Sequence, residues 1–186
     1  MSKIFRIINI ILLVVIIGAL KPSSLSAEYT VNYPSITNPT FQYADAKLWR
    51  YLRLGLNYLE SPAPLSEPET IPPTYMHPDL KGFGSYGLSP DAYLDVQEHY
   101  HFFKNYQWED ILHSQQLYEL ANQAFADWLL KNLKNNIHQN ARAKQIFDVL
   151  HKAWNVGLSG YKNGREVVSS RIKRAEEFYR LAKSSL

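Results

Sequence analysis

The chain has 186 residues, of which 20 are basic and 17 acidic, and it contains no cysteine. This length suffices for one hydrophobic core, and the lack of cysteine excludes a fold that depends on disulfides. Three basic residues in positions 1–27, which no acidic residue offsets there, account for the whole formal charge of +3. Residues 28–186 are therefore formally neutral, which argues against a nucleic-acid-binding surface.

The first 27 residues have the layout of a secretory signal peptide. A short basic start is followed by an apolar run from Ile10 to Ile17, which extends to Leu20, and then by the small and polar stretch KPSSLSA, which ends at Ala27. The apolar run is too short for a comfortable membrane span of about 20 residues. We therefore expect export to the periplasm or the extracellular space with cleavage after Ala27. The alternative is an uncleaved N-terminal anchor that retains the protein at the membrane.

Residues 28–45 are polar and lack a helical period, which predicts an extended N-terminal segment. A helix is predicted over 46–59, because apolar residues recur there at the spacing of one helical face, at Leu48, Leu52, Leu56 and Leu59. Residues 62–78 then hold six of the ten prolines. Proline cannot donate to a helix ladder and restricts the residue before it, so this range is predicted to be a long irregular loop.

Four further helices are predicted after this loop, at 90–103, 108–133, 143–154 and 165–182. The first has Ser89 as its N-cap, with Pro90 at its first helical position. The other three show apolar residues at helical spacing. Because the sequence contains no repeat and no convincing strand, the predicted fold class is mainly α, with little or no β.

Motifs for cofactors and metals occur only out of context. Gly82, Gly84 and Gly87 spell G-x-G-x-x-G, but a dinucleotide fingerprint follows a strand, whereas these glycines follow a proline-rich loop. His99 and His101 are two residues apart, whereas paired zinc ligands on a helix are four apart. We therefore predict no cofactor and no metal site.

Three short segments bear on function: NYLESP at the end of the first predicted helix, GSYGLSP before the second, and KAWNVG at the end of the 143–154 helix. In this order they resemble the soluble lytic transglycosylase family, which is related to goose-type lysozyme. That family has a catalytic E-S pair at a helix end, then a G-x-x-G-L-M-Q turn, and later A-[YW]-N-A-G. Glu60-Ser61 matches the E-S pair, and the later motifs are matched by Gly84, Gly87, Leu88, Ala153, Trp154, Asn155 and Gly157. The resemblance covers about residues 46–182.

The resemblance implies a lysozyme-like helical catalytic domain over 46–186. Its expected reaction is cleavage of the β-1,4 bond between N-acetylmuramic acid and N-acetylglucosamine in peptidoglycan, with a 1,6-anhydro product. Glu60 is expected to be the single catalytic residue, first as acid and then as base. The expected substrate-binding residues are Ser61, Tyr86, Gly87, Leu88, Trp154, Asn155 and Tyr161, with the rings of the two tyrosines available for stacking on sugars. The partners are expected to be peptidoglycan strands and no nucleic acid, with an envelope protein complex as a further candidate and a monomer as the expected state.

Departures from the family pattern leave alternatives open. The Met-Gln of the family turn is Ser89-Pro90 here, and the small residue of the late motif is Val156. A lysozyme-like protein that binds glycan or an envelope machine without cleaving is one alternative. An unrelated helical interaction protein of the envelope is another. A hydrolase would need a second acid to position water, and the loop supplies the candidates Glu67, Glu69 and Asp79.

Overall fold

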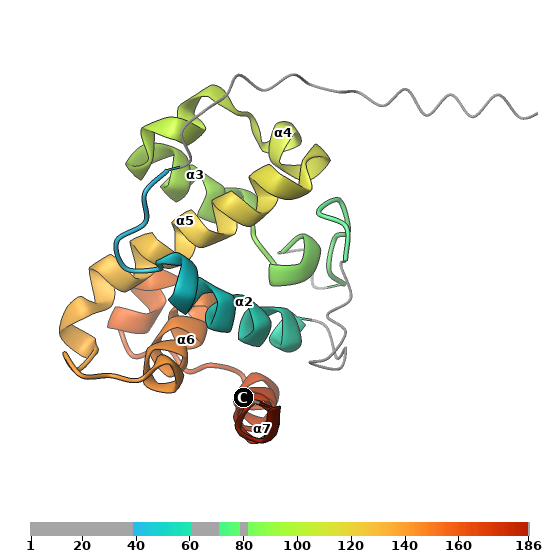
Figure 1. Ribbon diagram of the computed structural model, residues 1–186. Helices are drawn as coiled ribbons and strands as arrows, with labels where there is room; N and C mark the ends of the chain where they lie inside the picture. Colours follow the sequence, from blue (N-terminus) through green and yellow to red (C-terminus); the bar gives the residue numbers. More distant parts are fainter. Residues whose placement is uncertain (1–38, 61–70, 79–81, 186) are drawn as a thin grey trace, which may run out of the picture. The chain divides into compact units, whose positions relative to one another are not determined.

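The computed structural model describes residues 39–60, 71–78 and 82–185. These residues form six α-helices: α2 (Ala46–Glu60), α3 (Pro90–His99), α4 (Trp108–His113), α5 (Gln115–Leu133), α6 (Ala143–Lys162) and α7 (Ser169–Ser185) (Figure 1). There are also three short 3₁₀ helices, η1 (Gly84–Tyr86), η2 (His101–Asn105) and η3 (Lys134–Asn136). Within the described ranges, β structure is limited to isolated bridges that join Phe83 to Met76 and to Leu88. The predicted mainly α class is therefore confirmed.

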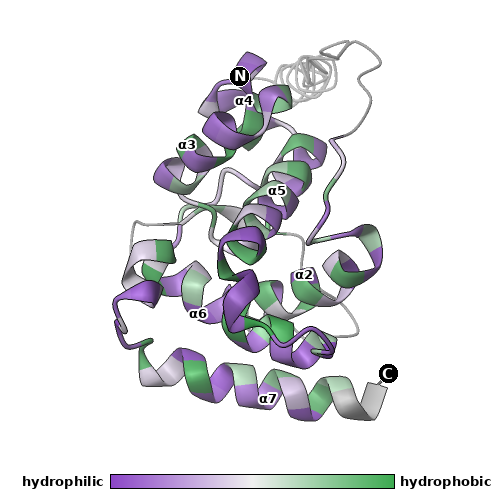
Figure 2. Cartoon of the chain, turned by 90° about the vertical axis from the view of Figure 1, so that its left-hand side faces the viewer, coloured by the Kyte–Doolittle hydropathy of each residue, from purple (hydrophilic) through white to green (hydrophobic). Residues whose placement is uncertain are grey.

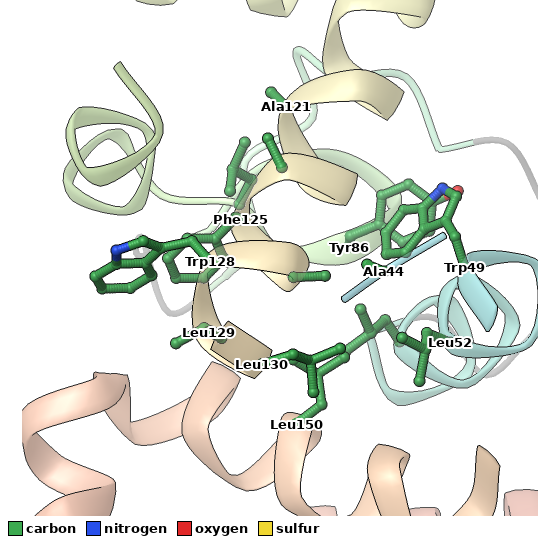
Figure 3. Packing of buried hydrophobic residues seen from close by; sticks show 14 of the residues in the cluster. Ala44, Trp49, Leu52, Tyr86, Ala121, Phe125, Trp128, Leu129, Leu130 and Leu150 are labelled. Atoms are coloured by element: carbon green, nitrogen blue, oxygen red, sulfur yellow. The ribbon is translucent and has the colours of Figure 1, made fainter. Parts of the chain in front are cut away.

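Helix α5 forms the centre of the helical packing, in contact with α3, α4 and α6 (Figure 1). Every residue from Ala124 to Leu130 is buried, so this part of α5 has no face toward water. Figure 3 shows the apolar side chains that surround it, among them Phe125, Trp128 and Leu129 of α5 itself. A helix that is buried all round must pack on every side, and α5 therefore joins the other helices into one core.

A buried carboxylate on α5 holds the segment that precedes α2. Asp127 accepts hydrogen bonds from the backbone N–H of Tyr43, from that of Ala44 at 2.7 Å, and from the hydroxyl of Tyr100 at 2.7 Å. Burial, together with this bond to the carboxylate, raises the pKa of Tyr100. Such donors are what a buried carboxylate requires. Residues 39–45, the described part of the predicted extended segment, contain no helix; the predicted signal peptide lies outside the described residues.

The helix predicted over 46–59 is α2. The helices predicted over 90–103 and 108–133 begin where predicted, but each is interrupted. Ser89 accepts a hydrogen bond from the backbone N–H of Ala92 at 3.1 Å and caps α3 as predicted. The prediction that this helix continues to 103 is wrong, because Tyr100 is extended (φ −120°, ψ 105°). The single helix predicted over 108–133 is also interrupted. Ser114 (φ −130°, ψ 110°) separates α4 from α5 and caps α5 by accepting a bond from Leu117 N–H at 3.3 Å.

Helix α6 differs from the prediction at its C-terminal end, and α7, predicted over 165–182 and observed over Ser169–Ser185, differs at both ends. Helix α6 continues to Lys162, past the predicted end at 154, with a break at Gly157 (φ 75°, ψ 160°). Glycine adopts this positive φ without the clash that a Cβ would cause. Helix α7 begins at Ser169, so residues 165–168, which were predicted to be helical, form an irregular link.

Helices α2, α6 and α7 meet at Gly55 of α2. A Cβ at this position would lie 2.4 Å from Cζ of Phe147 on α6 and 2.9 Å from Cε1 of Phe178 on α7. The ring centres of Phe147 and Phe178 are 5.1 Å apart. The missing side chain thus lets both rings approach the α2 backbone. Figure 2 shows that polar residues alternate with apolar ones along α7.

No helix among the described residues combines the length and the hydrophobicity that a membrane span requires.

Candidate functional site

Glu60 is the last residue of α2, and its side chain is only 10% exposed. Its Oε1 accepts a hydrogen bond from Nη2 of Arg171, which lies in the first turn of α7. The Arg171 side chain is 18% exposed, so the ion pair is largely shielded from water and from salt. The side chain of Glu60, the predicted catalytic residue, is therefore held in one orientation by a cationic partner.

The glycine turn follows the described part of the proline-rich loop and packs onto Glu60. Gly84 (φ 63°) begins η1, and Gly87 (φ 67°, ψ 32°) ends it in the left-handed region. The backbone N–H of Phe83 donates to the carbonyl of Leu88 at 2.9 Å, which closes the turn. A Cβ at Gly87 would lie 2.9 Å from Cδ of Glu60. The absence of a side chain at Gly87 thus allows the carboxylate to contact the turn.

Trp154 of α6 contacts the same turn from another element. Its indole N–H donates to the carbonyl of Tyr86 at 3.0 Å. Its ring packs edge-on against Phe125 of α5, with the ring centres 4.8 Å apart. Glu60 contacts Gly87 and Trp154 contacts Tyr86. The three segments that carry the family resemblance therefore converge on two neighbouring residues.

Tyr86 has a different role from the one expected. Its ring is 4% exposed, stacks on Tyr118 at 5.7 Å and packs near Trp49 (Figure 3). Its hydroxyl donates to Oε1 of Glu119 at 2.6 Å. Burial and the nearby Glu119 carboxylate raise the pKa of Tyr86. The expectation of a sugar-stacking face is thus corrected, because both faces of the ring are covered by the interior.

The remaining expected site residues lie on the turn and on α6. Leu88 is buried at 1% exposure and belongs to the core. Asn155 is partly exposed and lies two residues before the break at Gly157. Tyr161 is partly exposed and packs against the core. Ser61 lies outside the described residues, as do the candidate second acids Glu67, Glu69 and Asp79.

Two polar residues of this region were missed by the sequence analysis. Glu119 holds the hydroxyl of Tyr86, and Arg171 holds the carboxylate of Glu60. A signal for Arg171 exists, because it stands four residues before Ala175 and seven before Phe178, on the apolar stripe of α7. A charged residue at such a position needs a partner, but the spacing does not say which one.

A separate pocket of about 650 Å³ lies between η3, α6 and α7 and contains none of the expected site residues. His151 lines it at 1% exposure, and its Nδ1 has no hydrogen-bond partner among the described residues. Burial lowers the pKa of His151 to about 4, although the carboxylate of Asp148 at 3.6 Å opposes the shift. The other charged residues of the lining are of both signs, so the pocket favours no one class of ligand.

Comparison of the chain with protein-family models, with curated proteins and with solved structures finds no match.

Proposed function

We propose that this chain is a peptidoglycan lytic transglycosylase with a lysozyme-like fold and that Glu60 is its single catalytic residue. One observation carries the proposal. A largely buried carboxylate at a helix end lies against Gly87, while Trp154 holds the neighbouring residue of the same turn. These contacts join the three segments that resemble the family. The reaction requires export, which the layout of residues 1–27 predicts.

In the proposed reaction, the Glu60 carboxyl donates its proton to the glycosidic oxygen, and the bond between that oxygen and C1 of N-acetylmuramic acid breaks. The electron pair of the broken bond stays on the departing oxygen. The 6-hydroxyl of the same muramic residue then forms a bond to C1 and gives its proton to Glu60. No water is consumed, and Glu60 regains its proton for the next cycle.

Arg171 must release Glu60 during this cycle. A guanidinium has donors only, so it favours a carboxylate that accepts rather than a carboxyl that donates. The proton of the acid form needs an oxygen that is free to face the substrate. The ion pair between Arg171 and Glu60 is thus a resting arrangement, and substrate binding is the event that opens it.

The same ion pair favours a second candidate, a lysozyme-like protein that binds glycan without cleaving it. If Arg171 never leaves Glu60, the site retains its shape but lacks a proton donor. The exchange of the family's Met-Gln for Ser89-Pro90 points the same way, because Ser89 is engaged in capping α3.

The test is incubation of the purified protein with peptidoglycan, followed by mass spectrometry of the released muropeptides. We expect 1,6-anhydro products from the wild type and at least about 100-fold less from Glu60→Gln. Glu98→Gln, at an exposed position of α3, is the matched control and should cleave like the wild type. Products heavier by one water would indicate a hydrolase. No product from the wild type, with retention of the protein on peptidoglycan, would support the binding protein instead.

A further inference from the structure

Two arginines of α7, Arg171 and Arg174, lie near the end of α2. Arg171 uses Nη2 for Glu60, and its Nη1 is buried without a hydrogen-bond partner among the described residues. Arg174 stands three residues later on α7. Its Nη2 is also buried and has no hydrogen-bond partner among the described residues. The guanidinium of Arg174 lies 5.8 Å from the ring centre of Tyr58, two residues before Glu60 on α2. The two guanidinium groups thus flank the end of α2 with unused donors.

The charges around this end of α2 do not balance within the described residues. Glu177 and Arg180 of α7 also act on the Tyr58 hydroxyl. Near the Tyr58 hydroxyl there are thus two cations, Arg174 and Arg180, and one carboxylate, that of Glu177. Arg174 forms no ion pair with any described residue. A buried N–H without an acceptor is unfavourable, and a ligand that brings an acceptor relieves it.

A guanidinium fork matches the two oxygens of a carboxylate better than it matches the hydroxyls of a neutral sugar. We propose that Arg171 and Arg174 form a subsite for the lactyl carboxylate of N-acetylmuramic acid, next to Glu60. This inference rests on the proposed function and narrows its substrate. A muramic residue has a free lactyl carboxylate only where its peptide is absent, because the peptide is attached there as an amide. The preferred substrate is therefore a glycan strand without peptides.

The same subsite explains how Glu60 is released. When the substrate carboxylate reaches Arg171, that side chain exchanges one carboxylate for another. Glu60 then loses its cationic partner at the moment when the glycosidic bond arrives. The resting ion pair is therefore opened more readily by a glycan with a free lactyl carboxylate than by one whose lactyl group carries a peptide.

The test uses three disaccharides, none of which contains the bond that the enzyme is proposed to cleave. They are N-acetylglucosaminyl-N-acetylmuramic acid, its lactyl methylamide, and N,N′-diacetylchitobiose, which lacks the lactyl group. Isothermal titration calorimetry of the wild type should show at least about tenfold tighter binding of the free acid than of the other two. Equal affinities for all three, or binding of none, would overturn the proposal.

Variants of the arginines test whether the preference for the free lactyl acid depends on Arg174. Arg174→Gln should bring the three affinities within about twofold of one another while the affinity for N,N′-diacetylchitobiose stays within twofold of the wild type. Arg180→Gln is the control on the same helix and should keep the tenfold preference. Because loss of a buried guanidinium can loosen α7, Arg174→Lys, which keeps the charge but not the fork, is measured as well and should retain part of the preference. An undiminished preference in Arg174→Gln would contradict the proposal.

This test and the cleavage test fail separately. Discrimination among the disaccharides without any cleavage of peptidoglycan would support the arginine subsite and contradict the proposed enzymatic activity. The opposite result is equally fast cleavage of strands with and without peptides and no discrimination among the disaccharides. It would contradict the arginine subsite and support the proposed enzymatic activity.

Discussion

The carboxylate of Glu60 lies against the backbone of Gly87, and a Cβ built on Gly87 would lie 2.9 Å from Cδ and 3.1 Å from Oε1 of Glu60. The contact depends on glycine for two reasons. Gly87 has a φ of 67°, which L-residues rarely adopt, and the space beside its Cα is already occupied by the carboxylate. The last residue of α2 and the glycine turn are thus fitted to each other.

Substitution of Gly87 by alanine should therefore lower both stability and cleavage. The left-handed backbone costs an alanine about 1–2 kcal/mol, and the added methyl must displace Glu60. Gly164→Ala is the matched control, because Gly164 has a φ of 70° but nothing within 4 Å of its Cβ. Urea unfolding should show a loss of stability in both variants, larger in Gly87→Ala, whereas muropeptide release should fall only in Gly87→Ala. An equal loss of cleavage in the two would show that backbone strain, not contact with Glu60, is responsible.

Trp154→Phe should weaken the link between α6 and the glycine turn. The change removes the 3.0 Å hydrogen bond to the Tyr86 carbonyl and keeps most of the contact with Phe125. We expect a loss of about 1 kcal/mol in the free energy of unfolding and slower cleavage. Trp128→Phe is the comparison, since Trp128 stacks on the same Phe125 at 5.7 Å but lies away from the turn. Its cleavage rate should stay near that of the wild type, and a larger loss of rate in Trp128→Phe would contradict this account.

Gly55→Ala should destabilise the protein although alanine is the better helix former. Helix propensity favours alanine by about 1 kcal/mol, but the new methyl would lie 2.4 Å from the Phe147 ring. Overpacking of this kind costs about 1–3 kcal/mol. Phe147→Leu should relieve the clash, so thermal unfolding of the two single variants and the double variant forms a cycle. The clash is disproved if Gly55→Ala costs as much in the Phe147→Leu background as in the wild type.

His151 should make stability fall with pH below about 6.5. Burial lowers its pKa to about 4, whereas the unfolded chain has a value of about 6.5. Between these values the unfolded state binds a proton that the folded state does not, so the free energy of unfolding decreases as pH falls through this window. The full effect is about 3 kcal/mol.

Urea unfolding at several pH values from 7 to 4 measures this effect. His151→Phe, whose ring would pack on Phe147 as the imidazole does at 5.4 Å, should remove this part of the slope. His113→Phe, at an exposed position of α4, should leave it unchanged. Parallel curves for wild type and His151→Phe would exclude the assignment.

The local features of the fold could be predicted because they depend on neighbours in sequence. The apolar spacing of α2 and the Ser89-Pro90 start of α3 are signals of this kind. The break at Ser114 could not be predicted from hydrophobic spacing, because apolar residues continue in helical phase on both sides of it. The continuation of α6 beyond Gly157 was missed because glycine is more often found where a helix ends. Here the helix resumes after the glycine.

The sequence pointed to three segments that lie in contact in the structure, but it did not reveal the polar partners of their side chains. Glu60 contacts Gly87 of the glycine turn, and Trp154 donates a hydrogen bond to Tyr86 of the same turn. The ion pair between Glu60 and Arg171 joins residues 111 positions apart, and no periodicity encodes such a partner. Tyr86 was misjudged because a tyrosine suits a core and a sugar site equally well. Its burial depends on Trp49 and Tyr118, which come from two other helices.

Helix α5 is enclosed from Ala124 to Leu130, whereas α7 packs chiefly against α2. Water reaches the backbone of α5 only when several helices separate together, so its amide hydrogens should be among the slowest to exchange with deuterium. The amides of α7 need only a local opening. The cation that holds Glu60 is thus carried by a helix whose amides should exchange faster than those of the enclosed part of α5.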